Sequence, residues 1–338
     1  MRQLLLGTLL IIFSCTNKEP LTIDDEIQKL SEPFLTFLIE NDKVDTILTA
    51  NGTRLIIQPN SFEFNDGSVP NGPIKIQLKE VFEKPDMILN RLSTMSNGDL
   101  LESFGMINIK AESNGQELRI RKNTSLILEI VNKKNGSRGE LFYGKLKENK
   151  TIEWEYEGGN DITEVVDTII QKSNGLAEFK RTTYKIINYK KYFVSDTSFT
   201  TTYYPDADST RNTSFIYIPE HYKFEIKKLG WINCDRFVEV RNKTTLRIEI
   251  EDYSMPTGFI VFDSLNSATS LFFDNKGKAQ IDILPDKSSV DLVILDKIGD
   301  NIFWSKTSLT TGQVTSIKVK TNKITIEELR SELNKIGE

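Results

Sequence analysis

The sequence is poor in the residues that build most catalytic and metal centres: it has one histidine, His221, and two cysteines, Cys15 and Cys234. Because there is one imidazole, zinc sites that use several histidines are excluded, and any Ser-His or Cys-His nucleophilic centre depends on His221 alone. This histidine lies between Glu220 and Tyr222 in an aromatic segment. We expect that segment to be extended, with the imidazole facing solvent.

Several motifs are also missing: the glycine-rich phosphate loop, the dinucleotide-binding fingerprint and the Gly-x-Ser-x-Gly elbow of hydrolases. Asp206, Asp208 and Ser209 offer oxygen ligands for calcium, but the glycine and distal glutamate of an EF-hand do not follow, which favours a solvated turn. The sequence therefore predicts no cofactor, no metal site and no catalytic residue. Its many carboxylates still leave open an acid and base pair like that of glycoside hydrolases.

A large excess of charge of one sign is lacking too. The formal net charge is −5, and 43 basic and 48 acidic residues are scattered along the chain. No basic face is indicated, so we expect no binding to nucleic acid. With 338 residues, of which 38% are hydrophobic, the chain is long enough for two or three modest domains. Short segments rich in Phe, Tyr, Thr, Ile and Val predict a mainly β fold.

The N-terminus has the layout of a secretory signal, with a basic start and an apolar run, Leu4 to Phe13, that is too short to span a bilayer. The run Ile12-Phe13-Ser14-Cys15 resembles the lipobox of bacterial lipoproteins. The resemblance implies that residues 1–14 are a signal peptide and that the Cys15 thiol is alkylated with diacylglycerol. An ordinary signal peptide with an incidental cysteine is the alternative. A lipidated Cys15 would leave Cys234 without a partner for an intrachain disulfide.

Residues 15–32 are polar and acidic, and Pro20 interrupts any helix, so we expect a tether. Asn17, Lys18 and Glu19 loosely resemble the charged signal that exports some lipoproteins of the Bacteroidota to the cell surface. A solvated linker is the simpler interpretation. The protein is thus expected in the cell envelope as an outer-membrane lipoprotein, facing either the periplasm or the surface.

Residues 33–132 are predicted to form a first β domain. Apolar residues alternate with polar ones in three rows, as expected of half-buried strands: Ile74, Ile76 and Leu78; Ile107, Ile109 and Ala111; Leu126, Leu128 and Ile130. Turn dipeptides that tolerate positive φ fall near these rows: Asp66-Gly67, Asn71-Gly72, Asn97-Gly98 and Asn114-Gly115.

Two runs in this domain, residues 51–62 and 72–80, resemble uncharacterised exported lipoproteins of the Bacteroidota and, more distantly, the ZU5 β module. The resemblance implies a β-sandwich used for interactions. Residues 133–228 follow as an irregular, β-rich middle region. Its aromatic residues, among them Tyr203 and Tyr204, could form a ligand-binding face, but aromatic residues in polar surroundings more often cover a sheet.

The segment Leu229 to Phe237 resembles a recurrent signature of the same Bacteroidota proteins, and its physical interpretation is structural. Asp235 beside Arg236 could hold a loop through an ion pair. Cys234 would need a nearby base or positive charge to be reactive, and a small buried thiol is the simpler interpretation.

Residues 229–322 are predicted to form a second sandwich, since short alternating strands recur there at regular spacing. Residues 323–338 end the chain in a helix, with a capping box between Thr325 and Glu328. The apolar face of that helix, Ile326, Leu329, Leu333 and Ile336, is expected to dock on the body of the protein.

Together these features predict two β-sandwich-like domains, an irregular middle and a short C-terminal helix. They favour an envelope protein, not an enzyme, that contacts the membrane through its lipid anchor and presents its sheet faces to a protein or glycan partner. The alternatives are a carboxylate-dependent envelope hydrolase and a carbohydrate-binding component of a nutrient-uptake system. The second alternative would show exposed coplanar aromatic rings near Tyr203.

Overall fold

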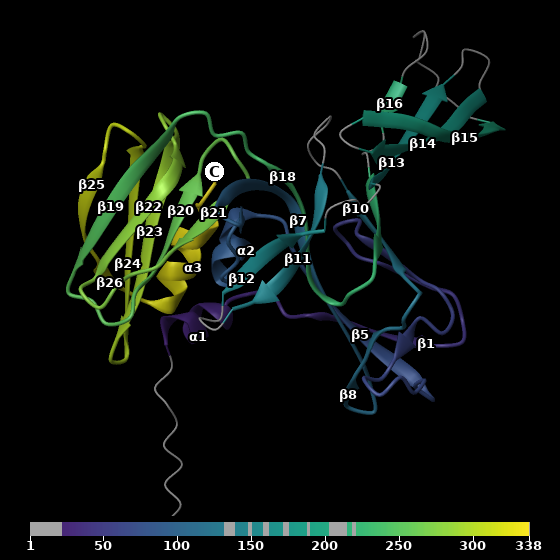
Figure 1. Ribbon diagram of the computed structural model, residues 1–338, viewed down its shortest axis with the longest axis horizontal. Helices are drawn as coiled ribbons and strands as arrows, with labels where there is room; N and C mark the ends of the chain where they lie inside the picture. Colours follow the sequence, from purple (N-terminus) through teal and green to yellow (C-terminus); the bar gives the residue numbers. More distant parts are fainter. Residues whose placement is uncertain are drawn as a thin grey trace, which may run out of the picture.

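A computed structural model of the chain describes residues 22–131, 139–147, 151–157, 162–171, 176–187, 190–202, 215–217 and 221–337. Two β-sandwiches lie side by side, and short helices fill the space between them (Figure 1). The fold is mainly β, with a short C-terminal helix, as the sequence predicts.

The first sandwich packs a sheet of order β1-β5-β7-β18-β11-β12 against one of order β15-β14-β13-β17-β10-β3-β2. The strands of the first sheet are β1 (Leu35–Glu40), β5 (Pro73–Val81), β7 (Asp99–Ser113), β18 (Gly230–Phe237), β11 (Glu140–Leu146) and β12 (Ile152–Tyr156), with β6 (Met95–Ser96) and β8 (Gln116–Glu117) paired to β7. Those of the second are β2 (Asp45–Leu48), β3 (Arg54–Ile57), β10 (Leu126–Val131), β17 (His221–Ile226), β13 (Ile162–Gln171), β14 (Leu176–Ile187) and β15 (Lys190–Thr202), with β16 (Phe215–Tyr217) on β13. A separate pair joins β4 (Phe62–Glu63) to β9 (Arg119–Ile120).

The alternating rows predicted from the sequence supply the core of this sandwich. Ile74, Ile76 and Leu78 of β5 are fully buried, and they share one apolar cluster with Leu126, Leu128 and Ile130 of β10. Two of the predicted turns close hairpins. Asn97 and Gly98 join β6 to β7, and Asn114 and Gly115 join β7 to β8, all four with positive φ. The local pattern therefore fixes these strands and their hairpin registers.

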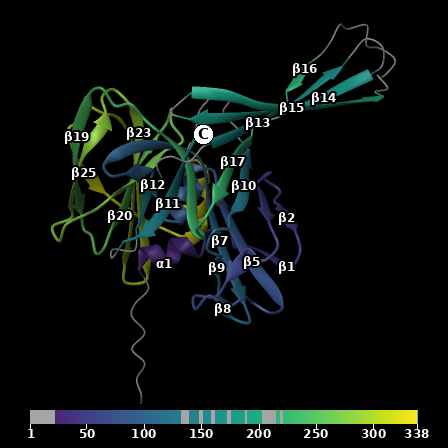
Figure 2. The ribbon, with the colours of Figure 1, turned by 45° about the vertical axis from the view of Figure 1, so that its right-hand side comes forward.

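The middle region extends the first sandwich. Strands β13, β14 and β15 form an antiparallel ladder attached to β17, and its far end projects away from the body (Figure 2). The aromatic residues Tyr203 and Tyr204, and the residues considered for calcium, Asp206, Asp208 and Ser209, lie outside the described residues.

The sequence places the start of the second domain at residue 229, but β18 belongs to the first sandwich. It lies between β7 and β11, paired to both in antiparallel register. The physical reason is the alternation within β18: Ile232 and Cys234 face the first core and are fully buried there. The chain thus returns to the first sandwich, through β17 and β18, before it begins the second.

The second sandwich begins at β19, and its core is the apolar cluster that includes Leu246, Ile260 and Leu292. One sheet has the order β22-β19-β25, with β25 parallel to β19, and the other the order β21-β20-β23-β24-β26. The strands are β19 (Lys243–Glu251), β20 (Thr257–Phe262), β21 (Ala268–Leu271), β22 (Lys278–Pro285), β23 (Ser289–Ile298), β24 (Asn301–Thr310), β25 (Ser316–Lys320) and β26 (Asn322–Ile324).

A third apolar cluster fills the interface between the sandwiches, which we call the seam. The first sandwich contributes Met106 and Trp154, and the second contributes Phe259 and Leu295. The helices of the described chain lie here: α1 (Ile23–Gln28), α2 (Lys84–Leu89) and α3 (Ile326–Asn334). Since the cluster is as well buried as a sandwich core, it holds the two sandwiches together as one body.

Helix α3 matches its prediction. Thr325 is the N-cap, its hydroxyl accepts the Glu328 N–H, and the Glu328 carboxylate accepts the Thr325 N–H in return. The predicted apolar face lies in the seam, where Leu329, Leu333 and Ile336 are buried. The helix therefore docks on the body of the protein, as its spacing predicts.

The predicted tether over residues 15–32 differs from the structure in its described part, which begins at residue 22. Helix α1 occupies residues 23–28 of this stretch. Its physical basis is visible in the sequence: Thr22 is a capping residue, and Ile23 and Ile27 are four residues apart, so both fall on one face. Both isoleucines are buried in the seam. Cys15 and the predicted signal peptide lie outside the described residues, and no helix in the described ranges is long and apolar enough to span a membrane.

Candidate functional site

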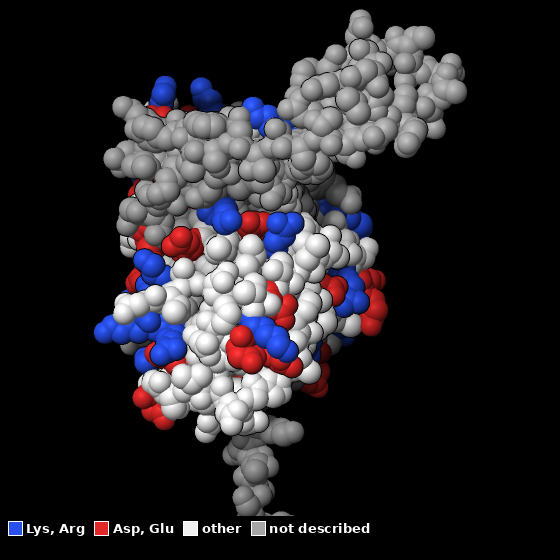
Figure 3. Space-filling view, turned by 90° about the vertical axis from the view of Figure 1, so that its right-hand side faces the viewer, with Lys and Arg blue, Asp and Glu red and all other residues white. Residues whose placement is uncertain are grey.

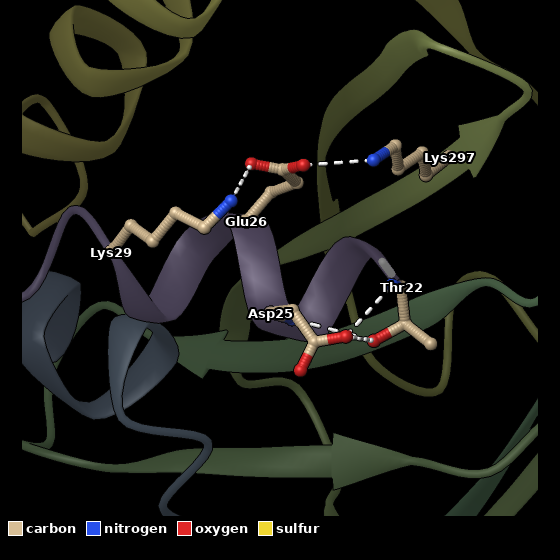
Figure 4. Close-up of polar contacts among 5 residues, drawn as sticks. All are labelled: Thr22, Asp25, Glu26, Lys29 and Lys297. Carbon is tan, nitrogen blue, oxygen red and sulfur yellow. Dashed lines mark hydrogen bonds and ion pairs between the residues drawn. The ribbon is translucent and has the colours of Figure 1, made fainter. Parts of the chain in front are cut away.

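The seam carries the best candidate for a functional site, and α1 is its first wall. The helix starts with a reciprocal cap: the Thr22 N–H donates to Asp25 Oδ2 at 2.8 Å, and the Asp25 N–H donates to Thr22 Oγ1 at 3.3 Å (Figure 4). The Glu26 carboxylate accepts from Lys29 at 2.9 Å and from Lys297 of β23 at 2.8 Å. These hydrogen bonds lower the pKa of Glu26, and the hydrogen bond from Lys297 contributes most to this shift. The helix is thus fixed to the second sandwich by an ionised carboxylate.

Asp24 connects α1 to both sandwiches. Its Oδ1 accepts a hydrogen bond of 2.7 Å from the Thr257 hydroxyl in β20, and its Oδ2 lies 3.1 Å from an Arg91 guanidinium nitrogen. Arg91 follows α2 and has a positive φ of 55°. Because both partners of the ion pair are mostly buried, the pair is better shielded from solvent than a surface contact. One side chain of α1 therefore bridges the two halves of the molecule.

A pocket of about 440 Å³, which we call the seam pocket, opens beside this bridge. Asp24, Arg91 and Thr151 line one side of it. The opposite side belongs to the second sandwich: the loop before β20, the start of β20, and the segment from Ser270 to Asn275. A pocket of this size is large enough for a small ligand or one or two side chains of a partner.

The second-sandwich side of the pocket is packed tightly. A Cβ added to Gly258 would lie 2.8 Å from the Phe273 ring and 3.0 Å from Ile294, so glycine is required for that ring to pack there. The loop before β20 is anchored by Asp296, whose carboxylate accepts the backbone N–H of Ser254 at 2.6 Å and of Met255 at 3.1 Å. The pocket therefore has a rigid floor and a fixed rim.

The carboxylates that line the seam pocket are already engaged. Asp24 is held by Thr257 and Arg91, as described above. Asp274 accepts the backbone N–H groups of Lys276 and Lys278 at 2.8 and 2.9 Å, and these hydrogen bonds lower its pKa. At neutral pH Asp274 is a fixed anion, and it is poorly suited to donate a proton.

The exposed apolar groups of the pocket are Phe272 and Met255, whose exposed fractions are 62% and 65%. Large apolar side chains that stay exposed at the rim of a pocket favour binding of a ligand or partner that carries an apolar group. The site thus combines a fixed ion pair, exposed apolar side chains and the end of β21, which is the edge strand of its sheet. Its arrangement suits binding.

The residues singled out in the sequence lie elsewhere. Cys234 is fully buried in the first core, and burial raises the pKa of its thiol, as expected for the predicted buried cysteine. His221, at the start of β17, is partly buried. The suggested pair of Asp235 with Arg236 does not form. Arg236 donates to Glu102 at 2.7 Å, while the Asp235 carboxyl accepts from the Asn233 side-chain amide on the opposite face of β18.

Asp235 is fully buried, and burial is the main cause that raises its pKa to about 8. Its Oδ2 accepts from the Asn233 side-chain amide at 2.5 Å, and its Oδ1 has no hydrogen-bond partner in the part of the chain that the structure describes. A carboxyl in this position is protonated at neutral pH. It lies within the sheet, away from the residues that line the seam pocket.

Two further cavities open on the described part of the molecule. One of about 230 Å³ includes Lys84, whose ammonium group donates to the backbone oxygens of Phe262 and Asp263. Another, of about 660 Å³, is an open hollow between β24, β26 and α3. Within the described ranges, no group of three or more His, Cys, Asp or Glu side chains is placed to hold a metal ion.

The surface carries both signs of charge. On the face in Figure 3, acidic and basic side chains are interspersed over the described part of the molecule. Comparison with protein-family models and with curated proteins finds no match to the chain.

Sequence reasoning missed the seam pocket, because its residues come from segments far apart in the chain. Only the helix beside it left a local signal, the capping box of Thr22 with Asp25. The positions of Arg91 and Phe272 depend on how the sandwiches pack together, and neither shows a local motif.

Proposed function

We propose that this protein is a lipid-anchored component of a bacterial cell envelope with a non-catalytic, structural or binding role. The observation that carries the proposal is the docking of α1, the first described element after the predicted anchor, in the seam. Its carboxylates contact the first sandwich at Arg91 and the second at Thr257 and Lys297. A chain anchored at Cys15 would be fixed to both sandwiches at once.

The length of the linker supports a binding role near the membrane. Six residues, 16–21, separate Cys15 from Thr22. Fully extended, the seven steps from Cys15 to Thr22 reach about 25 Å, from roughly 3.5 Å per residue. The seam pocket, which Asp24 lines, would then open within a short distance of the lipid surface. A partner bound there would be held close to the membrane.

Acylation is the test. The full chain, a Cys15→Ala variant and a Cys234→Ala variant are expressed in a Bacteroidota host, and each is examined by intact mass and by detergent phase partition. The second cysteine variant is the matched control, because it removes a thiol of equal chemistry that is buried in the core. We expect wild type and Cys234→Ala to carry acyl chains and enter the detergent phase, and Cys15→Ala to do neither.

If all three proteins are released without acyl chains, the anchor is absent and the proposal fails. If Cys15→Ala is acylated like the wild type, lipidation occurs elsewhere and the proposed anchor is wrong. Stability of each variant, measured by thermal unfolding, shows that loss of partition does not come from misfolding.

A further inference from the structure

Among the residues that the structure describes, only part of the edge of strand β21 is covered. Thr94 lies against it: the Thr94 N–H donates to the Ala268 oxygen at 2.7 Å, and the Ala268 N–H donates to Thr94 Oγ1 at 3.1 Å. Ala268 therefore directs its backbone groups outward, away from β20. This segment of the first sandwich covers the free edge of the second, as a short added strand would.

The cover ends at the seam pocket. Ser270, two residues further along β21, reaches only the Ser93 hydroxyl, at 3.4 Å. Beyond Ser93 the chain leads back to Arg91, which has a left-handed backbone conformation and lines the seam pocket with Ser270. Phe272 directly follows Leu271, the last residue of β21, and if the alternation of the antiparallel strand continues for one more residue its backbone groups point outward like those of Ala268 and Ser270. Within the described ranges, no hydrogen bond to the Phe272 backbone is formed.

The same alternation places side chains. Ala268 is buried in the seam cluster, so Phe272, four residues on, faces the same side of the sheet. Its ring is 62% exposed and lies at the pocket rim with Met255. The pocket thus offers outward backbone groups and an exposed aromatic ring at the same point.

We propose that the seam pocket binds an extended polypeptide segment, which continues the edge of β21 past Ser270 and lays one large apolar side chain against Phe272. The inference rests on the proposed function, because it names the class of partner that the anchored protein would hold. Strand addition of this kind draws affinity from backbone hydrogen bonds and specificity from a side-chain pocket.

A polypeptide is favoured over a glycan for a specific reason. The part of the edge next to the pocket is already covered by polypeptide, through backbone and hydroxyl groups of residues 93 and 94. Phe272, which lines the pocket, follows directly after the last residue of this strand. A bound glycan would be detected in the same experiment.

The test uses the full chain in detergent micelles, with its acylation state read from intact mass. The probe is a fluorescein-labelled, blocked pentapeptide of four threonines with a central phenylalanine, followed by anisotropy. A peptide with central alanine and two peptides N-methylated at adjacent residues are compared. The variants are Phe272→Ala and, as the matched control, Leu38→Ala, an exposed apolar side chain on β1 of the first sandwich.

We expect saturable binding of the phenylalanine peptide that weakens at least about tenfold in Phe272→Ala, about 1.4 kcal/mol, and stays unchanged in Leu38→Ala. Methylation should weaken binding at one of the two adjacent amides and leave the other unaffected, because alternate amides face the edge. Thermal unfolding checks that both variants are folded.

Absence of binding, equal loss in both variants, or equal effects of the two methylations would overturn the inference. Binding of cellohexaose at the same site, with no binding of the peptide, would overturn it in favour of a glycan. Failure of this inference can be told apart from failure of the proposed function. Acylated protein that does not bind the peptide contradicts only the inference. Unacylated protein that binds the peptide contradicts only the proposed anchor.

Discussion

The buried carboxyl of Asp235 makes a prediction about how stability depends on pH. The residue is fully buried in β18, and its folded pKa is raised from an ordinary value near 3.8 to about 8. Asp235→Asn replaces the protonated carboxyl with a neutral group of nearly the same shape. The variant therefore removes the titration while it keeps most of the packing.

The sign follows from linkage. Between about pH 4 and pH 8 the unfolded chain has lost the Asp235 proton and the folded chain retains it, so rising pH favours the unfolded state. The stabilisation that the bound proton provides is fully present below the unfolded-state pKa, near 3.8, and is lost as pH rises through the folded-state pKa, about 8. Each pH unit within the window costs at most about 1.4 kcal/mol. Between pH 5 and pH 7 the wild type should lose about 2.7 kcal/mol through this group alone.

The assay is urea unfolding at pH 5, 6 and 7, followed by tryptophan fluorescence. The free energy of unfolding of Asp235→Asn relative to wild type should rise by roughly 2 to 3 kcal/mol across this range. A constant offset from imperfect hydrogen bonding of the new amide does not affect the slope. The control is Glu239→Gln, which removes an exposed carboxyl just after the same strand. Parallel curves for Asp235→Asn and wild type would refute the reasoning.

Other predictions concern the helices of the seam. Leu333→Ala should lower the free energy of unfolding by about 2 to 5 kcal/mol, because its side chain is 1% exposed; a loss under about 1 kcal/mol in urea would contradict the seam core. Thr325→Ala should cost about 1 kcal/mol and Thr325→Ser much less, since the cap needs a hydroxyl; equal losses would argue against the cap. Glu26→Gln should be less stable than wild type at pH 7, and the difference should begin to shrink as pH falls below about 4.5 and vanish once pH has passed below the lowered pKa of the folded state; a difference independent of pH would count against the Lys297 contact.

The strands of the first domain could be predicted because their signal is local. Alternation at Ile74, Ile76 and Leu78 specifies one buried face, and Asn-Gly dipeptides specify the tight turns beside it. The same signal exists at Tyr222, Phe224 and Ile226, which alternate with charged residues and are buried in the first core. That row was overlooked because weak periodicity surrounds it.

Strand partners could not be predicted in this way. Nothing local in β18 indicates that it pairs with β7, more than 120 residues earlier in the chain. Pairing depends on which apolar faces fit together, and that is decided by the whole fold. The seam pocket has the same origin: Arg91 and Phe272 become neighbours of one cavity only after both sandwiches have packed. The position of the pocket therefore depends on tertiary packing and not on a local sequence motif.

The late return of β17 and β18 has a consequence for the order in which the chain becomes folded. Strands β7 and β10 are made early, but each lacks a neighbour until residues 221–237 have been synthesised. Until then their backbone edges are open to other chains. A fragment cut at residue 132, the domain boundary that the sequence indicates, would be left with those edges for good.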